Sequence, residues 1–317
     1  MPVLCAVLIG AALGQSFLVD LFDTPVLRTG STVFVAVVVQ ALPFLVLGVL
    51  ISGAVAAFLP ADRLRRMLPR RTALGVPVAG LAGAALPGCE CASVPVARRL
   101  MQQQVAPAVA LAFLLASPAI NPIVLITTAV AFPGRPEMAL ARFLGSLSTA
   151  VVTGWLWQRF GRSDWLAEQA LRRLPDSDGQ SRWQLFTETA RHDLVDAGGF
   201  LIIGGLASAV LNVLVPSAWL DAIGGHLALG VIVMSVLAVI LALCSEADAF
   251  VAASLAGIPL VPRLVFLVVG PVVDLKLIAL QAGTFGRRFA LRFAPLTFLV
   301  AIGCALVVGL PLLGGGR

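Results

Sequence analysis

Hydrophobic residues occupy long, nearly uninterrupted blocks of this chain, and polar residues are confined to the short stretches between them. Most of the nine blocks are about as long as the roughly 20 apolar residues that a membrane-spanning helix needs. The blocks cover residues 3–19, 33–59, 74–97, 105–132, 139–160, 197–215, 226–258, 263–282 and 291–313. This pattern predicts an all-α polytopic membrane protein.

The polar stretches divide the chain. Residues 3–19 have no basic segment before them and run into Asp20, so we expect a retained helix rather than a cleaved signal peptide. The longest polar stretch reads as an aqueous linker between two membrane halves. We therefore expect an extra N-terminal transmembrane helix and loop (1–32), a first membrane repeat (33–160), a polar cytoplasmic linker (161–196) and a second membrane repeat (197–317).

The arginines indicate which blocks cross the membrane. Block 74–97 is broken by Pro-Gly-Cys-Glu-Cys at positions 87–91, and block 226–258 is too long for one crossing. If every block crosses, the arginines divide 10 to 11 between the two sides, whereas they divide 16 to 5 if these two blocks return to their side of entry. Because short cytoplasmic loops collect arginine, the second division is favoured. We predict seven crossings and two re-entrant hairpins, with Arg98 and Arg99 at the cytoplasmic side.

The two halves of the chain resemble each other. Phe-Leu-Val-Leu-Gly at 44–48 matches Phe-Leu-Ile-Ile-Gly at 200–204, and further matches follow at slowly drifting offsets. They are Cys89 with Cys244, Pro118 with Pro271, Asn121 with Asp274, and Arg142 with Arg292. Each repeat would hold an odd number of crossings, so the halves should be inverted, a plan that recurs in secondary transporters. The alternative is a duplicated membrane scaffold that transports nothing.

Composition narrows the function classes. The chain is 59% hydrophobic and 12% charged, with a mean hydropathy of +1.00, which excludes a soluble enzyme and a secreted disulfide scaffold. The net charge of +6 comes without Tyr and without basic residues interleaved with aromatics, so no nucleic-acid partner is expected. No phosphate-binding Gly-x-x-x-x-Gly-Lys motif occurs, so active transport would need an ion gradient or a partner subunit.

Ionisable residues inside apolar blocks mark the candidate pathway. Each costs about 2.5–3.5 kcal/mol on insertion scales, so its presence asks for an explanation. The residues are Glu90, Glu246, Asp248, Asp274 and Lys276, and all lie in or beside helix breaks. Irregular backbone at membrane depth is tolerated where it is buried in protein or lines a cavity, which favours a pathway over lipid contact. Alternatively, Asp274 and Lys276 pair with each other or with the other acids and hold the halves together.

Three cysteines occupy the same breaks. If the repeat brings Cys89, Cys91 and Cys244 together, their thiols suit a soft, thiophilic solute. A structural zinc site would need four ligands at wider spacing, and both histidines lie elsewhere, so we expect no resident metal and no cofactor. Alternatively, small residues simply fit a tight hairpin tip. We expect the solute site to consist of Cys89, Glu90, Cys91, Asn121, Cys244, Ser245, Glu246, Asp248, Asp274 and Lys276.

Four motifs in this order resemble the predicted-permease family of bacteria and archaea, which includes efflux permeases for trivalent organoarsenicals. They are Pro-Gly-Cys-Glu-Cys-Ala-Ser-Val-Pro-Val-Ala-Arg-Arg-Leu at 87–100, Ala-Ser-Pro-Ala-Ile-Asn-Pro at 116–122, Cys-Ser-Glu-Ala-Asp-Ala-Phe at 244–250 and Gly-Pro-Val-Val-Asp-Leu-Lys at 270–276. The resemblance implies a multi-pass permease of the bacterial or archaeal inner (plasma) membrane. It also implies that Cys89, Cys91 and Cys244 coordinate trivalent arsenic, while Glu246, Asp248 or Asp274 couples export to protons.

We therefore expect a secondary transporter, not an enzyme, that exports a small thiophilic solute such as a trivalent organoarsenical by alternating access. Its partners would be that small-molecule or metalloid solute and the lipid bilayer, and a homo-oligomer is left open. Two alternatives remain. One is a membrane thiol-disulfide oxidoreductase in which Cys89 and Cys91 exchange with Cys244. The other is an uncoupled channel or facilitator.

Overall fold

The computed structural model describes residues 25–58, 69, 71–86, 89–167, 181–214, 227–255 and 257–314. Helices dominate these residues and no strand occurs among them, which confirms the all-α prediction. The predicted first helix at 3–19, part of the predicted linker, and the Pro-Gly step at 87–88 lie outside the described residues.

The described part of the first half contains six helices. They are α3 (Pro25–Phe58), α5 (Thr72–Gly83), α6 (Glu90–Gln102), α7 (Pro107–Ile120), α8 (Pro122–Ala131) and α9 (Pro136–Phe160). Proline starts α7, α8 and α9, because its fixed φ suits the first helical turn and its missing N–H is not needed there. Only Asn121 separates the end of α7 from the start of α8, so the two form one helical segment with a break at Asn121.

The second half repeats this order. A short 3-10 helix, η1 (Ser163–Trp165), precedes α11 (Arg182–Leu214), α13 (Leu227–Leu241), α14 (Asp248–Ser254), α15 (Leu260–Val269), α16 (Leu275–Phe285) and α17 (Arg287–Leu313). Helix α11 runs without interruption through residue 196, where we placed the end of the linker. The last part of the predicted linker is therefore helical and continuous with the start of the predicted second membrane repeat.

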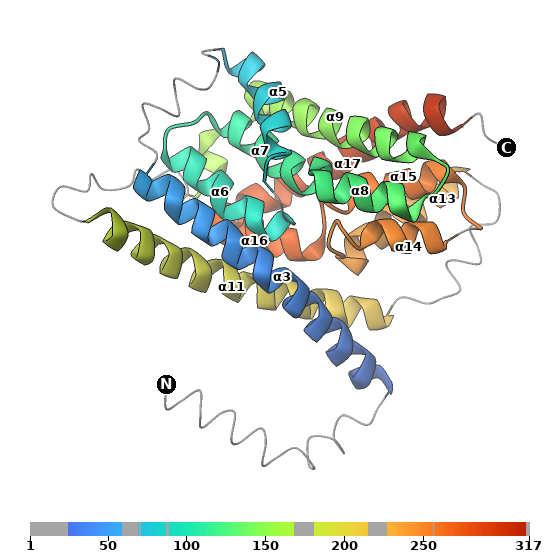
Figure 1. The fold of residues 1–317 in the computed structure, drawn as a ribbon, viewed down its shortest axis with the longest axis horizontal. Coiled ribbons are helices and arrows are strands. Elements are labelled where there is room, and N and C mark those ends of the chain that lie inside the picture. Colours follow the sequence, from blue (N-terminus) through green and yellow to red (C-terminus); the bar gives the residue numbers. More distant parts are fainter. Residues whose placement is uncertain are drawn as a thin grey trace.

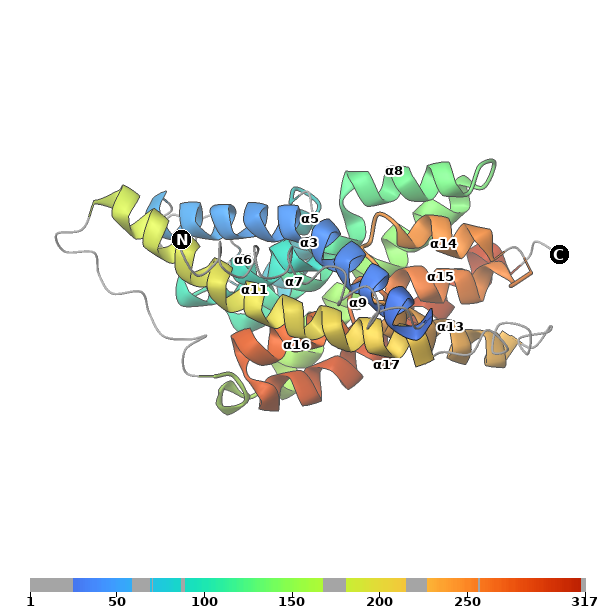
Figure 2. The same cartoon turned by 90° about the horizontal axis from the view of Figure 1, so that it is seen from below.

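The buried central helices of the two halves make equivalent contacts. The buried helix α7 packs on α5 and α9, and its counterpart α15 packs on α13 and α17. The long helices α3 (blue) and α11 (yellow) run side by side along one face of the molecule, with α6 against α3 and α16 against α11 (Figure 1, Figure 2). The starts of α6 and α16 thereby lie in the interior, where the two halves meet.

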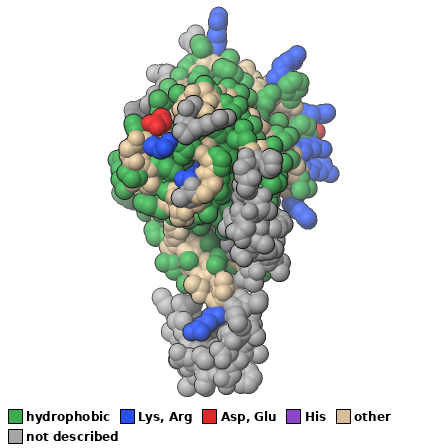
Figure 3. All heavy atoms as spheres, turned by 90° about the vertical axis from the view of Figure 1, so that its right-hand side faces the viewer, with side chains coloured by type: hydrophobic (Ala, Val, Ile, Leu, Met, Phe, Trp, Pro, Cys, Tyr) green, Lys and Arg blue, Asp and Glu red, His purple; other side chains and the backbone are tan. Residues whose placement is uncertain are grey.

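Four described helical segments are long and apolar enough to span a membrane. They are Arg28–Phe58, Pro107–Ala131, Pro136–Phe160 and Arg287–Leu313, and α5, α13, α15 and α16 are shorter apolar helices. Hydrophobic side chains cover much of the face in Figure 3, and Val39, Ile126 and Val307 are each more than 60% exposed. Such a surface fits contact with lipid, as expected for a multi-pass membrane protein. The count of seven crossings stays a prediction.

Candidate functional site

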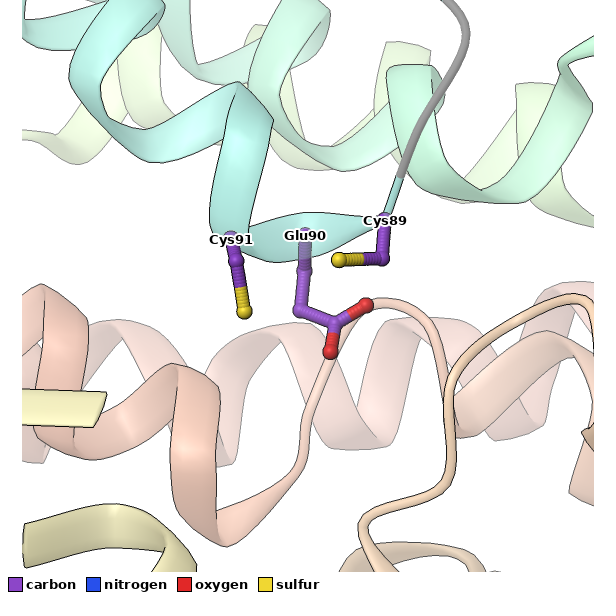
Figure 4. A group of neighbouring side chains, drawn as sticks. All are labelled: Cys89, Glu90 and Cys91. Carbon is purple, nitrogen blue, oxygen red and sulfur yellow. The ribbon is translucent and has the colours of Figure 1, made fainter. Parts of the chain in front are cut away.

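The start of α6 gathers two thiols and a carboxyl group. Cys89 caps the helix in an extended conformation, and Glu90 lies in its first turn, where a negative charge is favoured by the helix dipole. The Sγ atoms of Cys89 and Cys91 and a carboxylate oxygen of Glu90 lie within 4.8 Å of one another, and all three residues are fully buried. Their side chains project from α6 toward the chain of the second half (Figure 4).

The start of α16 meets this cluster. Asp274 caps α16, and its Oδ1 accepts a hydrogen bond from the backbone N of Leu277 at 2.5 Å. The Lys276 ammonium forms an ion pair with Glu90, lies 3.8 Å from Asp274 Oδ2 and donates to the Ala242 carbonyl at 3.3 Å. Lys276 is fully buried, so a single ammonium balances carboxylates from both halves of the chain.

The third thiol comes from the turn between α13 and α14. This turn contains Ala242 at a positive φ of 47°, and the Cys244 carbonyl accepts from the backbone N of Ala247 and of Asp248. The Cys89 and Cys91 thiols lie within 4.8 Å of each other, and Cys89 is the thiol of this pair that interacts most directly with Cys244. Lys276 Nζ is 4.0 Å from Cys244 Sγ. The structure thus brings together three free, buried cysteines from two halves of the chain.

A second junction between the halves is centred on Arg142 of α9. Its Nη1 donates to Thr128 Oγ1 at 2.8 Å, and its Nη2 donates to Asp248 Oδ2 at 2.8 Å and to the Ser245 carbonyl at 3.1 Å. Arg142 is fully buried and Asp248 nearly so. We counted Arg142 among loop arginines in the sequence. Its position inside the apolar block 139–160 was the available signal that it has a buried partner.

Three further predicted site residues occupy the neighbourhood without joining the thiols. Asn121 caps α8 as Asp274 caps α16, because its Oδ1 accepts from the backbone N of Val124 at 2.9 Å. Ser245 contributes its carbonyl to Arg142, as described above. Neither carboxylate oxygen of Glu246 has a hydrogen-bond partner among the described residues, although both are buried. Asn121 therefore acts as a helix cap, and the Glu246 carboxylate has both oxygens available to accept hydrogen bonds.

Two glycines allow the long helices to approach the thiol junction closely. A Cβ on Gly48 of α3 would lie 2.4 Å from the Cα of Ala92, two residues beyond Glu90. A Cβ on Gly204 of α11 would lie 2.7 Å from the Cα of Lys276 itself. Real Cβ atoms do not come so near to backbone, so these two positions require glycine. The pair also falls at matching positions of the sequence repeat.

A third buried ion pair lies toward the far end of α6. Arg99 Nη2 is 3.0 Å from Asp193 Oδ2, and Ser52 Oγ donates to the same oxygen at 2.8 Å. Arg98 adds a longer contact of 3.7 Å with Asp193. This network ties α3 and α6 to α11. We missed it in the sequence because Asp193 falls in the predicted aqueous linker, whereas the structure buries it.

Comparison with known proteins gives consistent results. The family described as predicted permease matches residues 27–310. A Streptococcus mutans protein, provisionally named as a subunit of a two-component membrane permease complex, is 32% identical over 282 residues, covering 87% of this chain and 94% of its own. The UPF0718 protein YcgR of Bacillus subtilis is 32% identical over 292 residues, covering 88% and 97%. No solved structure matches.

Proposed function

The chain belongs to the predicted-permease family, and we propose that it is a secondary transporter that exports a small thiophilic solute across the bacterial or archaeal inner membrane. A trivalent organoarsenical is the solute class that we favour. The observation that carries this proposal is the meeting of Cys89, Cys91 and Cys244 beside a buried ion pair at the junction of the two halves. Thiol sulfur is a soft ligand and selects soft partners.

The chemistry of capture requires no redox partner. When a monosubstituted arsenical, R–As(OH)2, meets two thiols, two As–S bonds form and two As–O bonds break. The two thiol protons leave with the two hydroxyl groups as two molecules of water, and arsenic stays trivalent. The reverse reaction releases the solute. Reversible exchange of this kind suits a carrier, which must let go of what it binds.

Several contacts support alternating access between inverted repeats, residues 33–160 and 197–317. The broken helix in each half brings a capping side chain to the same position, Asn121 in one and Asp274 in the other. Helix α6 packs on α16 of the opposite half, and α14 packs on α8 in the corresponding way. Broken helices that meet across a repeat interface are where secondary transporters bind their substrates.

Active export needs an energy source. Coupling to protons would fall to Glu246, Asp248 or Asp274, and of these Asp248 is already held by Arg142. The name of the Streptococcus mutans relative also favours a partner subunit as a second component of the transporter. A homo-oligomer remains compatible with this arrangement.

Flux through proteoliposomes tests the proposal. We would measure movement of phenylarsine oxide with and without a pH gradient, for the wild type and for Cys89→Ser, Cys91→Ser and Cys244→Ser. Flux should fall roughly tenfold or more in each variant. Cys304→Ser is the matched control, because Cys304 lies in α17 away from the junction and should leave flux unchanged.

Each rival predicts a different result. Flux that survives all three substitutions would show that the thiols are not the solute site. Flux that is the same with and without the pH gradient would favour the uncoupled channel or facilitator. Thiol-disulfide turnover without net movement of solute would favour the oxidoreductase.

A further inference from the structure

The three thiols are not equivalent. The Cys89 and Cys91 thiols lie within 4.8 Å of each other, and Cys89 rather than Cys91 is the one in direct side-chain interaction with Cys244. Cys89 and Cys91 both belong to the start of α6, in the first half, and Cys244 belongs to the second half. The cluster therefore offers two dithiol pairs that share one sulfur. One pair lies within a single half, and the other spans the two halves.

We propose that the cluster is a two-position thiol relay, in which the cargo stays bonded to Cys89 and moves between Cys91 and Cys244. This inference rests on the proposed function, and it specifies the cargo as a trivalent metalloid with one organic group and two exchangeable positions. Such a cargo occupies two thiols at a time. A third thiol is then always free to attack it.

The exchange step balances without any further reactant. With the cargo on Cys89 and Cys91, the sulfur of Cys244 attacks arsenic, an As–S bond to Cys244 forms and the As–S bond to Cys91 breaks. The proton of the Cys244 thiol ends on the Cys91 sulfur, and no electrons are lost or gained. Attack proceeds through the thiolate, as in other thiol exchange reactions.

A cation lies beside the attacking thiol. The Lys276 ammonium lies 4.0 Å from Cys244 Sγ, and a nearby cation stabilises a thiolate. Glu90 stands between the two cysteines of α6 and forms an ion pair with Lys276, which holds the ammonium at the cluster. The ammonium 4.0 Å from the attacking thiol would offset part of the cost of forming a buried thiolate.

The two positions differ in what they connect. Cargo on Cys89 and Cys91 is held at the start of α6 alone and adds no covalent bond between the halves. Cargo on Cys89 and Cys244 is a covalent bridge between α6 and the turn that precedes α14. Transfer between the two positions would therefore make and break a covalent link between the halves. The position of the cargo would in this way be linked to the conformation of the transporter.

Mapping of protected cysteines in the wild-type protein tests the relay directly. The purified full chain would be loaded with one equivalent of phenylarsine oxide, alkylated with N-ethylmaleimide under denaturing conditions that leave the dithiol adduct intact, and analysed by peptide mass spectrometry. Cys89 should be protected throughout, while Cys91 and Cys244 should each be protected in part of the molecules. Full protection of Cys91 and Cys244 with Cys89 alkylated would overturn the relay.

Binding to single variants provides the second arm. Cys91→Ser and Cys244→Ser each leave one dithiol pair and should bind phenylarsine oxide within about tenfold of the wild type, while Cys89→Ser should lose about 100-fold or more. Both binding-competent variants should nevertheless fail to transport. If Cys89→Ser binds as tightly as the wild type, the relay is wrong and the thiol site stands. If no cysteine is protected and flux is unchanged in all three variants, the proposed function itself fails.

Discussion

Two of the buried ion pairs that join the halves of this protein differ in how many hydrogen bonds their polar atoms make. At the first, Arg142 donates to a hydroxyl, a carbonyl and the Asp248 carboxylate. At the second, neither carboxylate oxygen of Glu90 has a hydrogen-bond partner among the described residues beyond its ion pair with Lys276, and three thiols lie alongside. Arg142 Nε and Asp248 Oδ1 also lack a partner among the described residues, but the Arg142 junction makes more hydrogen bonds. It is therefore the one suited to holding the halves together, and the sparsely bonded Glu90 junction is suited to exchanging partners.

The largest expected effect is on the Arg142 junction. Asp248→Leu would leave a buried guanidinium that cannot lose its proton, so the free energy of unfolding should fall by about 3–5 kcal/mol. Fluorescence-detected size-exclusion chromatography after heating in detergent would measure this loss. The double variant Arg142→Met with Asp248→Leu removes both charges and should recover most of the stability. If Asp248→Leu alone is as stable as the wild type, the Arg142 junction does not hold the halves together and the two junctions do not differ in this respect.

A smaller loss of stability is expected at the thiol junction. Lys276→Met leaves two buried carboxyl groups without the ammonium, and a carboxyl group, unlike a guanidinium, has a neutral form, so we expect a cost of about 1–3 kcal/mol. Flux of phenylarsine oxide, by contrast, should be abolished. The double variant Glu90→Gln with Lys276→Met should regain stability without regaining flux. Restored flux in that variant would mean that this pair, too, only holds the halves together.

A loss of stability of the same size, with no charge removed and no loss of flux from the thiols themselves, is expected from helix packing at the thiol junction. Gly48→Ala would place a methyl group against the backbone at Ala92, and forcing the helices apart should cost about 1–3 kcal/mol. Gly198→Ala is the matched control, because a Cβ there meets nothing within 4 Å, and alanine should favour the helix by up to about 1 kcal/mol. Thermal stability in detergent separates the two. Equal behaviour would show that α3 need not touch α6.

Sequence patterns anticipated the fold class and the residues around the breaks, but not their partners. Long apolar blocks require helices in a membrane, so the all-α architecture follows from composition and length. A charge inside such a block indicates that a partner exists without identifying it. Glu90 and Lys276 lie in different repeats, and their pairing depends on how the two broken segments meet. The sequence around either residue therefore does not identify the other as its partner.

The sequence patterns also placed two buried charged residues at the surface. Polar composition between the halves suggested a solvated connection, yet Asp193 is buried against Arg99 and Ser52. Helical continuity of α11, rather than composition, decides where that residue lies. Arg142 was missed for a related reason: the rule that assigns arginines to loops treats each as a surface charge, and a buried arginine violates it.

Helix α11 has a mechanical consequence. At Asp193 it is fastened to Arg99, and at Gly204, 11 residues further along, its backbone rests on Lys276. At 1.5 Å per residue these two points are about 16 Å apart on one unbroken rod. Because the helix is continuous between these points, a displacement at the Arg99 end would be transmitted along α11 to the backbone that touches Lys276.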